Sequence, residues 1–259
     1  MISKKFEELK GKAYPLIGYA VAGYPSLDDS RKVIKAMING GVDILEIGIP
    51  FSDPIADGPI IQKASYQALS RGITPKQALE LCNDIRREFD IPIAIMTYCN
   101  ILYRTGYEKF IINAKKNGVN GFIIPDLSLE EADPLRKLLV KNNMDLILLV
   151  SPNTSIDRIK KISNIASGFL YLVSVYGTTG IRSRFEDYTR KAIVRVKKYS
   201  KLPVGVGFGV SKPEHVRFMI DAGADAVIVG SAFIKAIDDG FDKVEELARD
   251  LKRACIISS

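Results

Sequence analysis

Metal-binding and disulfide-forming residues are scarce in this sequence of 259 residues. Its three cysteines, Cys82, Cys99 and Cys255, are too few and too scattered for a disulfide framework or a zinc site. The single histidine, His215, follows Pro213 in the expected first turn of a helix, where we expect it at the surface. A zinc-dependent aldolase normally needs several histidines, so we expect no metal site.

Long apolar runs are also missing. No stretch of about 18 strongly apolar residues is present, which argues against a membrane span. The N-terminal residues MISKKFEELKGK are charged and lack the apolar core of a secretory signal, so we expect a cytoplasmic protein with no membrane association.

The net charge of the chain does not identify the class of ligand or partner that it binds. The net charge of +7 could favour an anionic ligand or weak nucleic-acid contact. However, the densest basic stretch, residues 190–201, carries Ile193 and Val196 on an apolar stripe. This is typical of the solvated face of an amphipathic helix, so we expect no nucleic-acid partner.

The sequence does contain an eightfold alternation of β-rich and helical segments. Eight short runs bounded by turn residues predict strands, and most are apolar throughout, which is typical of a parallel sheet covered on both faces. They lie at residues 15–23, 43–48, 91–98, 121–126, 145–150, 168–174, 203–209 and 225–230. The segments between them have helical spacing and capping residues.

This alternation predicts one α/β domain over residues 1–259, folded as a closed (β/α)8 TIM barrel. Residues 1–9 precede the first strand and can form an extra N-terminal helix under the barrel floor. An open, doubly wound sheet is the alternative. No G-x-G-x-x-G motif follows the first strand, which weakens that alternative.

In this fold the loops at the carboxyl ends of the strands carry the chemistry, and loops 49–60 and 175–187 are long. No lysine lies within or just beyond a predicted strand end, which disfavours a Schiff-base aldolase and leaves acid–base work to carboxylates. Glu46 is the strongest candidate for an acid–base catalyst, because it lies between Leu45 and Ile47 in an otherwise apolar strand. If it faces the barrel mouth, desolvation would raise its pKa toward neutrality.

Three aspartates near strand ends have a local explanation as well as a functional one. Asp57 precedes a glycine, Asp53 precedes a proline and Asp126 follows a proline, and each pattern is typical of a turn. The residues alone leave both interpretations open for all three.

Glycines follow the last two predicted strands. Gly205, Gly207 and Gly209 leave backbone N–H groups open, and the pair Gly230–Ser231 opens a short helical segment. Loops seven and eight form a recurrent phosphate site in such barrels, although tight-turn geometry is an alternative reason for these glycines. The residues therefore favour an enzyme that acts on a small phosphorylated metabolite with carboxylates and without a metal.

The string DILEIGIPFSDPIADGPIIQKA, residues 43–64, resembles the signature of the tryptophan synthase α-subunit family. The segments GYAVAGYPS, MTYCN, PDL, YLVSVYGTTG, VGFGVSKPE and VIVGSAF also match this family in order, so the resemblance covers nearly the whole chain. It implies a lyase of tryptophan biosynthesis that cleaves indole-3-glycerol phosphate to indole and glyceraldehyde 3-phosphate. It also implies an α2β2 assembly in which the β-subunit receives the indole and carries pyridoxal phosphate, with no cofactor in this chain.

The resemblance further implies a role for each matching residue. Glu46 would protonate indole C3 and accept the glycerol hydroxyl proton, while Asp57 would hold the indole N1–H. The matching substrate-binding positions are Tyr19, Met96, Tyr98, Ile123 and Phe208 around the indole, Tyr171 as a hydrogen-bonding group, Thr179 as a partner of the catalytic aspartate, and Gly180, Gly209, Gly230 and Ser231 at the phosphate. The apolar positions would also serve as plain barrel filling.

Two other functions stay open. One is a catalytically silent chain that only activates a partner, and the other is a different phosphate-binding barrel enzyme of the same pathway. Both carboxylates are present, which disfavours the silent chain, and the strand ends supply no catalytic lysine for the other enzyme.

Overall fold

The computed structural model describes residues 2–173, 182–207 and 209–257. Eight parallel strands form a closed barrel in sequence order. The strands are β1 (Leu16–Val21), β2 (Ile44–Gly48), β3 (Ile93–Met96), β4 (Gly121–Ile123), β5 (Asp145–Val150), β6 (Leu170–Val173), β7 (Val204–Gly207) and β8 (Ala226–Val229). The predicted (β/α)8 barrel is confirmed, and the open sheet is wrong because β1 pairs with β8 through Leu16 and Val227.

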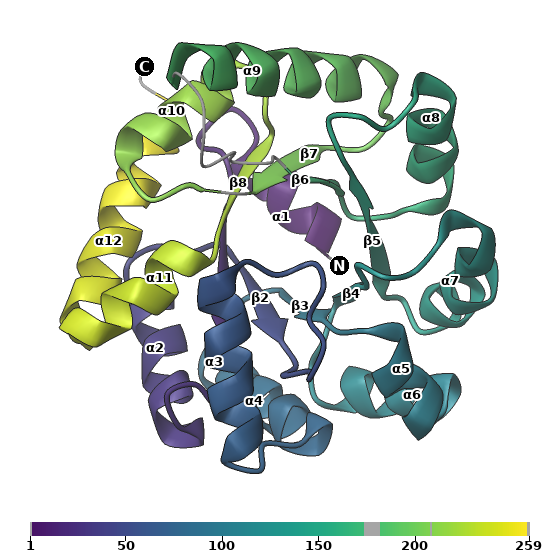
Figure 1. The fold of residues 1–259 in the computed structure, drawn as a ribbon, viewed down its shortest axis with the longest axis vertical. Coiled ribbons are helices and arrows are strands. Elements are labelled where there is room, and N and C mark those ends of the chain that lie inside the picture. Colours follow the sequence, from purple (N-terminus) through teal and green to yellow (C-terminus); the bar gives the residue numbers. More distant parts are fainter. Residues whose placement is uncertain (1, 174–181, 208, 258–259) are drawn as a thin grey trace.

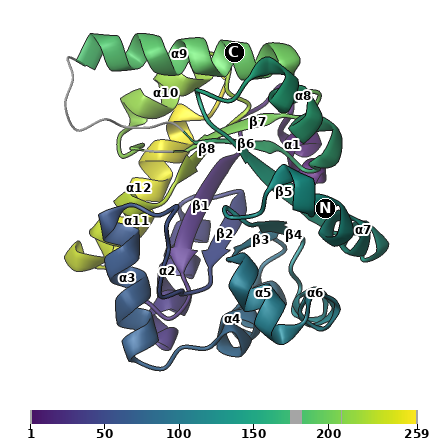
Figure 2. The same ribbon diagram turned by 45° about the vertical axis from the view of Figure 1, so that its right-hand side comes forward.

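Helices form a ring around these strands (Figure 1), and the turned view in Figure 2 shows the same enclosure. The α-helices are α1 (Ile2–Leu9), α2 (Leu27–Asn39), α3 (Pro59–Ser70), α4 (Pro75–Glu88), α5 (Cys99–Thr105), α6 (Tyr107–Lys116), α7 (Ala132–Lys141), α8 (Ile156–Ile165), α9 (Arg182–Tyr199), α10 (Pro213–Asp221), α11 (Ser231–Ala236) and α12 (Phe241–Ala254). Two short 3-10 helices, η1 (Leu129–Glu131) and η2 (Ile237–Asp239), precede α7 and follow α11.

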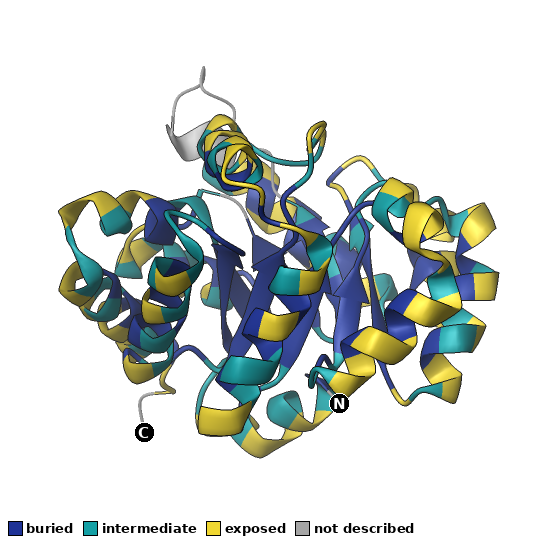
Figure 3. Cartoon of the chain, turned by 90° about the horizontal axis from the view of Figure 1, so that it is seen from below, coloured by how far each residue is buried: buried dark blue, intermediate teal, exposed yellow. Residues whose placement is uncertain are grey.

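The strands are buried on both faces, as their apolar runs predict, and Figure 3 shows them as the buried centre of the molecule. Successive residues of a strand point to opposite sides, so alternation separates two apolar layers. In β2, Leu45 and Ile47 pack in the layer shared with the helices, whereas Ile44 packs inside the barrel. The same alternation places Glu46 inside, opposite Tyr19 of β1.

Helix α1 lies at the floor of the barrel, so the predicted N-terminal helix is confirmed. The Ile2 N–H group donates a hydrogen bond of 2.9 Å to Oδ2 of Asp145, the first residue of β5. Ile2 is fully buried in the interior cluster, and the Phe6 ring lies 5.9 Å from the Phe169 ring. This packing closes the end of the barrel that is opposite the carboxyl ends of the strands.

Two further expectations concern α9 and α10, which belong to the outer ring of helices. Ile193 and Val196 of α9 are fully buried, which confirms that the basic stretch is the solvated side of an amphipathic helix. His215 is half-buried at the start of α10, and its Nδ1 accepts a hydrogen bond of 3.3 Å from the Ser211 N–H group. Within the described part of the chain, no helix is long and apolar enough to cross a membrane.

Candidate active site

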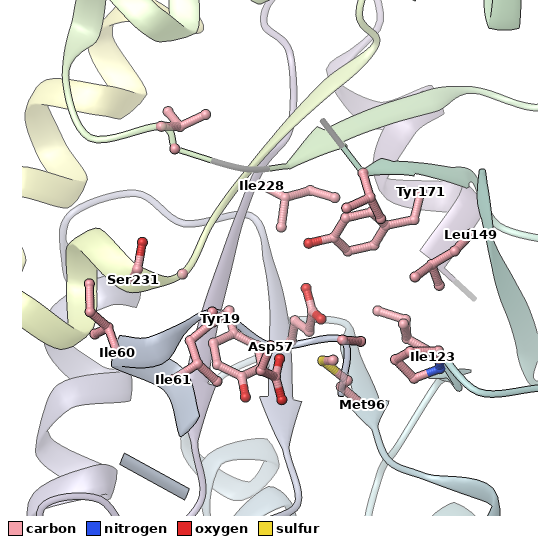
Figure 4. A pocket seen from close by; sticks show the side chains of 18 of the residues that line it. Tyr19, Asp57, Ile60, Ile61, Met96, Ile123, Leu149, Tyr171, Ile228 and Ser231 are labelled. Atoms are coloured by element: carbon pink, nitrogen blue, oxygen red, sulfur yellow. The ribbon is translucent and has the colours of Figure 1, made fainter. Parts of the chain in front are cut away.

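A cavity of about 410 Å³ opens at the carboxyl ends of the strands. Every strand, or the loop directly after it, supplies a lining residue; these are Tyr19, Glu46, Met96, Ile123, Leu149, Tyr171, Gly209 and Ile228. The loop after β2 adds Asp57, and α3 adds Ile60 and Ile61. Figure 4 shows Asp57, Met96, Ile123 and Tyr171 around this common space.

Glu46 is the carboxylate on the inner wall of this cavity. Glu46 is 1% exposed, and its Oε2 atom has no hydrogen-bond partner in the described part of the chain. Burial, followed by the charge of Asp57, raises the pKa of Glu46 from 4.5 to about 8. Near neutral pH this side chain is therefore mainly protonated and can donate a proton into the cavity.

Asp57 lies in the loop between β2 and α3, where its N–H group donates to the Pro54 carbonyl in a turn. The local turn explanation thus holds for its backbone, while its side chain lines the cavity. Burial raises the pKa of Asp57 from 3.8 to about 6, and a hydrogen bond from Tyr98 opposes that rise. Near neutral pH Asp57 is mainly ionised, so the two carboxyl groups occupy opposite protonation states.

Tyr98 lies behind Asp57 and is not among the residues that line the cavity, although we expected it on the indole-pocket wall. Its hydroxyl donates a hydrogen bond of 3.1 Å to Oδ2 of Asp57 and accepts one of 3.3 Å from the Ala56 N–H group. The Phe51 ring stacks on the Tyr98 ring with centroids 4.8 Å apart. Tyr98 therefore fixes the loop that carries Asp57.

Two inward-facing glycines make room for the remaining cavity tyrosines. A Cβ atom at Gly48 would collide with the hydroxyl of Tyr19, and one at Gly207 would lie 2.7 Å from the hydroxyl of Tyr171. Burial, followed by the charges of Glu46 and Asp57, raises the pKa of both tyrosines above the usual value, so both remain neutral hydrogen-bonding groups.

Backbone atoms of Gly209 and Gly230 and the hydroxyl of Ser231 line the part of the cavity that is formed by the loops after β7 and β8. Gly209 has a positive φ of 69°, a conformation that glycine adopts without strain. Gly230 and Ser231 follow β8, and a Cβ atom at Gly230 would lie 3.3 Å from the Tyr19 ring. Lys235 of α11 also lines the cavity and is exposed to solvent.

The other two aspartates lie outside the cavity; the side chain of Asp53 has a local role, whereas that of Asp126 binds a residue 27 positions away in sequence. Both carboxylate oxygens of Asp126 accept hydrogen bonds from the Cys99 N–H group, at 3.0 and 3.1 Å, at the start of α5. Asp53 accepts a hydrogen bond from the hydroxyl of its neighbour Ser52. Neither side chain lines the cavity.

The structure thus brings most of the predicted site residues to one cavity: Tyr19, Glu46, Asp57, Met96, Ile123, Tyr171, Gly209, Gly230 and Ser231. Thr179, Gly180 and Phe208 lie outside the described residues. Among the lining residues that sequence reasoning missed are Ile60, Ile61, Leu149, Ile228 and Lys235. Strand alternation could have identified Leu149 and Ile228, which are two residues beyond the interior residues Ile147 and Ala226.

Comparison with known proteins gives a consistent result. Residues 6–257 match the family described as Tryptophan synthase alpha chain. The protein of that name from Methanosarcina barkeri is 46% identical over 255 residues, which cover 97% of this chain and 95% of the relative. The one from Methanocaldococcus jannaschii is 45% identical over 244 residues, which cover 93% of this chain and 86% of the relative.

Solved structures agree. A crystal structure of tryptophan synthase from M. tuberculosis, in an aminoacrylate- and BRD0059-bound form, matches with a TM-score of 0.91 and 30% identity, covering 99% of this chain and 98% of that chain. A mutant tryptophan synthase alpha-subunit from Pyrococcus furiosus matches with a TM-score of 0.84 and 37% identity, covering 93% of this chain and 98% of that chain.

Proposed function

This chain belongs to the tryptophan synthase alpha chain family, lyases that cleave indole-3-glycerol phosphate in tryptophan biosynthesis, and we propose that Glu46 and Asp57 perform the cleavage here. One observation carries the assignment of roles. The two carboxyl groups share a cavity, and their pKa values of about 8 and about 6 fall on opposite sides of neutrality. Such a separation assigns one group as the acid and the other as the fixed charge.

In the first step the indole becomes electrophilic. Glu46, in its protonated form, donates its proton to indole C3, and the ring becomes an indoleninium cation. The ionised Asp57 accepts a hydrogen bond from the N1–H group and stabilises the positive charge there. Because the site is buried, this electrostatic stabilisation is stronger than it would be in water.

In the second step the carbon–carbon bond breaks. The Glu46 carboxylate accepts the proton of the hydroxyl on the carbon attached to C3, and that carbon becomes the aldehyde of glyceraldehyde 3-phosphate. The electron pair of the broken bond returns to the ring and neutralises the cation, which releases indole. Glu46 ends the cycle protonated, as it began, so the reaction consumes no external acid or base.

The remaining lining residues fit the two ends of this substrate. Met96, Ile123 and Leu149 offer an apolar wall for the flat indole ring. Gly209, Gly230 and Ser231 offer backbone N–H groups and a hydroxyl for the phosphate. The hydroxyl of Tyr171 can donate a hydrogen bond to the glycerol chain.

We further propose that the chain works in the cytoplasm with a β-subunit, in an α2β2 assembly. The matching M. tuberculosis structure is of tryptophan synthase, which supports a place for this chain in such a complex, and we propose that the β-subunit carries the pyridoxal phosphate. This chain needs no cofactor of its own, because Glu46 supplies both proton transfers and Asp57 stabilises the cation between them. Its cysteines are free thiols in the described part of the chain, which fits a reducing compartment.

Indole release from indole-3-glycerol phosphate by the purified chain, with and without β-subunit, tests the function. Glu46→Gln and Asp57→Asn should each lower turnover by roughly 10²–10⁴, the usual contribution of a positioned proton-transfer group for Glu46 and of a fixed charge that stabilises the transition state for Asp57. Asp53→Asn is the matched control, since Asp53 lies in the same loop but outside the cavity. If Glu46→Gln or Asp57→Asn keeps more than about a tenth of wild-type turnover, the role of that residue is wrong.

A further inference from the structure

The proposed substrate poses a charge problem for this cavity. Its phosphate is a dianion, and two of the lining residues, Glu46 and Asp57, are themselves carboxyl groups. Asp57 is mainly ionised near neutral pH, so it repels a second anion in the same low-dielectric space. Backbone N–H groups at Gly209 and Gly230 supply only partial positive charge. A full positive charge at the mouth of the cavity would offset this repulsion.

Lys235 is the one lysine, arginine or histidine among the described residues that line the cavity. It lies four residues after Ser231 in α11, so the two side chains share one face of the helix. Side chains in a helix lean toward its N-terminus, which directs the Lys235 stem toward Ser231 and the loop after β8. The ammonium group can therefore reach a phosphate held at Gly230 and Ser231.

The positive charge of Lys235 is also free to bind a ligand, because no acidic neighbour in the described part of the chain pairs with it. Asp238 and Asp239 follow it by three and four residues, at positions from which a helix often forms ion pairs. Neither forms one with Lys235, and the side chain of the lysine forms no hydrogen bond or ion pair with the described part of the chain. By contrast, Lys252 and Lys197 are held in ion pairs with Asp43 and Asp225.

We propose that Lys235 binds the phosphate of the substrate and favours phosphorylated over neutral ligands, an inference that rests on the proposed function. The ammonium group is a compact charge with three donors on a flexible stem, so it can follow a phosphate at the cavity mouth. Because the side chain is exposed, salt screens its contribution.

The test compares Lys235→Gln with Lys116→Gln. Lys116, in the last turn of α6, is an exposed lysine outside the cavity, so its substitution causes the same loss of net charge. We expect Lys235→Gln to raise the KM for indole-3-glycerol phosphate about tenfold, the scale of one charge-assisted hydrogen bond, with kcat within about twofold of wild type. The dissociation constant for glycerol 3-phosphate should rise by a similar factor, and that for indole should not change.

Two further measurements separate electrostatics from structure. The effect of Lys235→Gln on KM should shrink when NaCl is raised from about 50 mM to about 500 mM, and Lys235→Arg should recover most of the wild-type KM. An unchanged KM and an unchanged glycerol 3-phosphate affinity in Lys235→Gln, or an equal loss of indole binding, would overturn the proposal. Failure of the wild-type chain to release indole would instead refute the proposed function, while the glycerol 3-phosphate titration still reports on Lys235.

Discussion

The hydrogen bond from Tyr98 to Asp57 makes a quantitative prediction about pH dependence. Tyr98→Phe removes the hydroxyl that donates to Oδ2 of Asp57 at 3.1 Å, but it keeps the ring that stacks on Phe51. The hydroxyl favours the ionised form of Asp57, so its loss should raise the pKa of Asp57 above its present value of about 6.

The size of the shift follows from the energy of such a bond. A hydrogen bond to a charged group contributes about 1.5–3 kcal/mol, and one pKa unit corresponds to about 1.4 kcal/mol. Water that enters the space of the hydroxyl replaces part of the bond, so we expect a rise of about one unit, to roughly pKa 7. The ionised fraction of Asp57 then falls about ninefold at about pH 5 and less than twofold at about pH 7.5.

The assay is kcat/KM for indole release between about pH 5 and pH 9. The wild type should give a bell-shaped profile, with an acidic limb near pH 6 from Asp57 and a basic limb near pH 8 from Glu46. Tyr98→Phe should move the acidic limb upward and leave the basic limb in place.

Tyr103→Phe is the matched control for this variant, because Tyr103 is a tyrosine of the neighbouring helix α5 that is 76% exposed. A loss of the same factor at every pH would show that Tyr98 acts only through packing. No change at any pH would show that the hydroxyl does not act on Asp57.

Two other substitutions test the protein further: Glu46→Gln should increase stability at high pH, and Gly230→Asp should weaken phosphate binding. The pKa of Glu46 is raised from 4.5 to about 8 in the folded chain, so its contribution to stability is complete below pH 4.5 and is lost as the pH rises through 8. Glu46→Gln should therefore gain stability relative to wild type as the pH rises, by at most about 5 kcal/mol, and urea unfolding at about pH 5 and pH 9 measures this; an equal difference at both pH values would contradict it. Gly230→Asp should weaken glycerol 3-phosphate binding strongly and indole binding little in calorimetric titrations, because a carboxylate would occupy the proposed phosphate position. Gly230→Ala is its control, since a Cβ atom there lies 3.3 Å from the Tyr19 ring, and equal losses in both variants would indicate a distorted cavity.

Properties that depend on neighbours along the chain could be predicted from the sequence. The apolar runs predicted all eight strands, because a strand buried on both faces needs apolar residues at every position. Glu46 was recognisable for the same reason, since one charged residue breaks that local pattern. Strand alternation then placed it beside Ile44 on the inner face.

Properties that depend on residues distant in sequence needed the tertiary structure. Whether Asp57 only forms a turn or also acts in a cavity depends on its desolvation and on Tyr98, which is 41 residues away. Lys235 resembles any surface lysine in the sequence, and only the position of α11 over the barrel mouth brings it to the cavity. Periodicity predicts which face a side chain occupies, but the pKa and the reach of that side chain depend on what the rest of the chain packs around it.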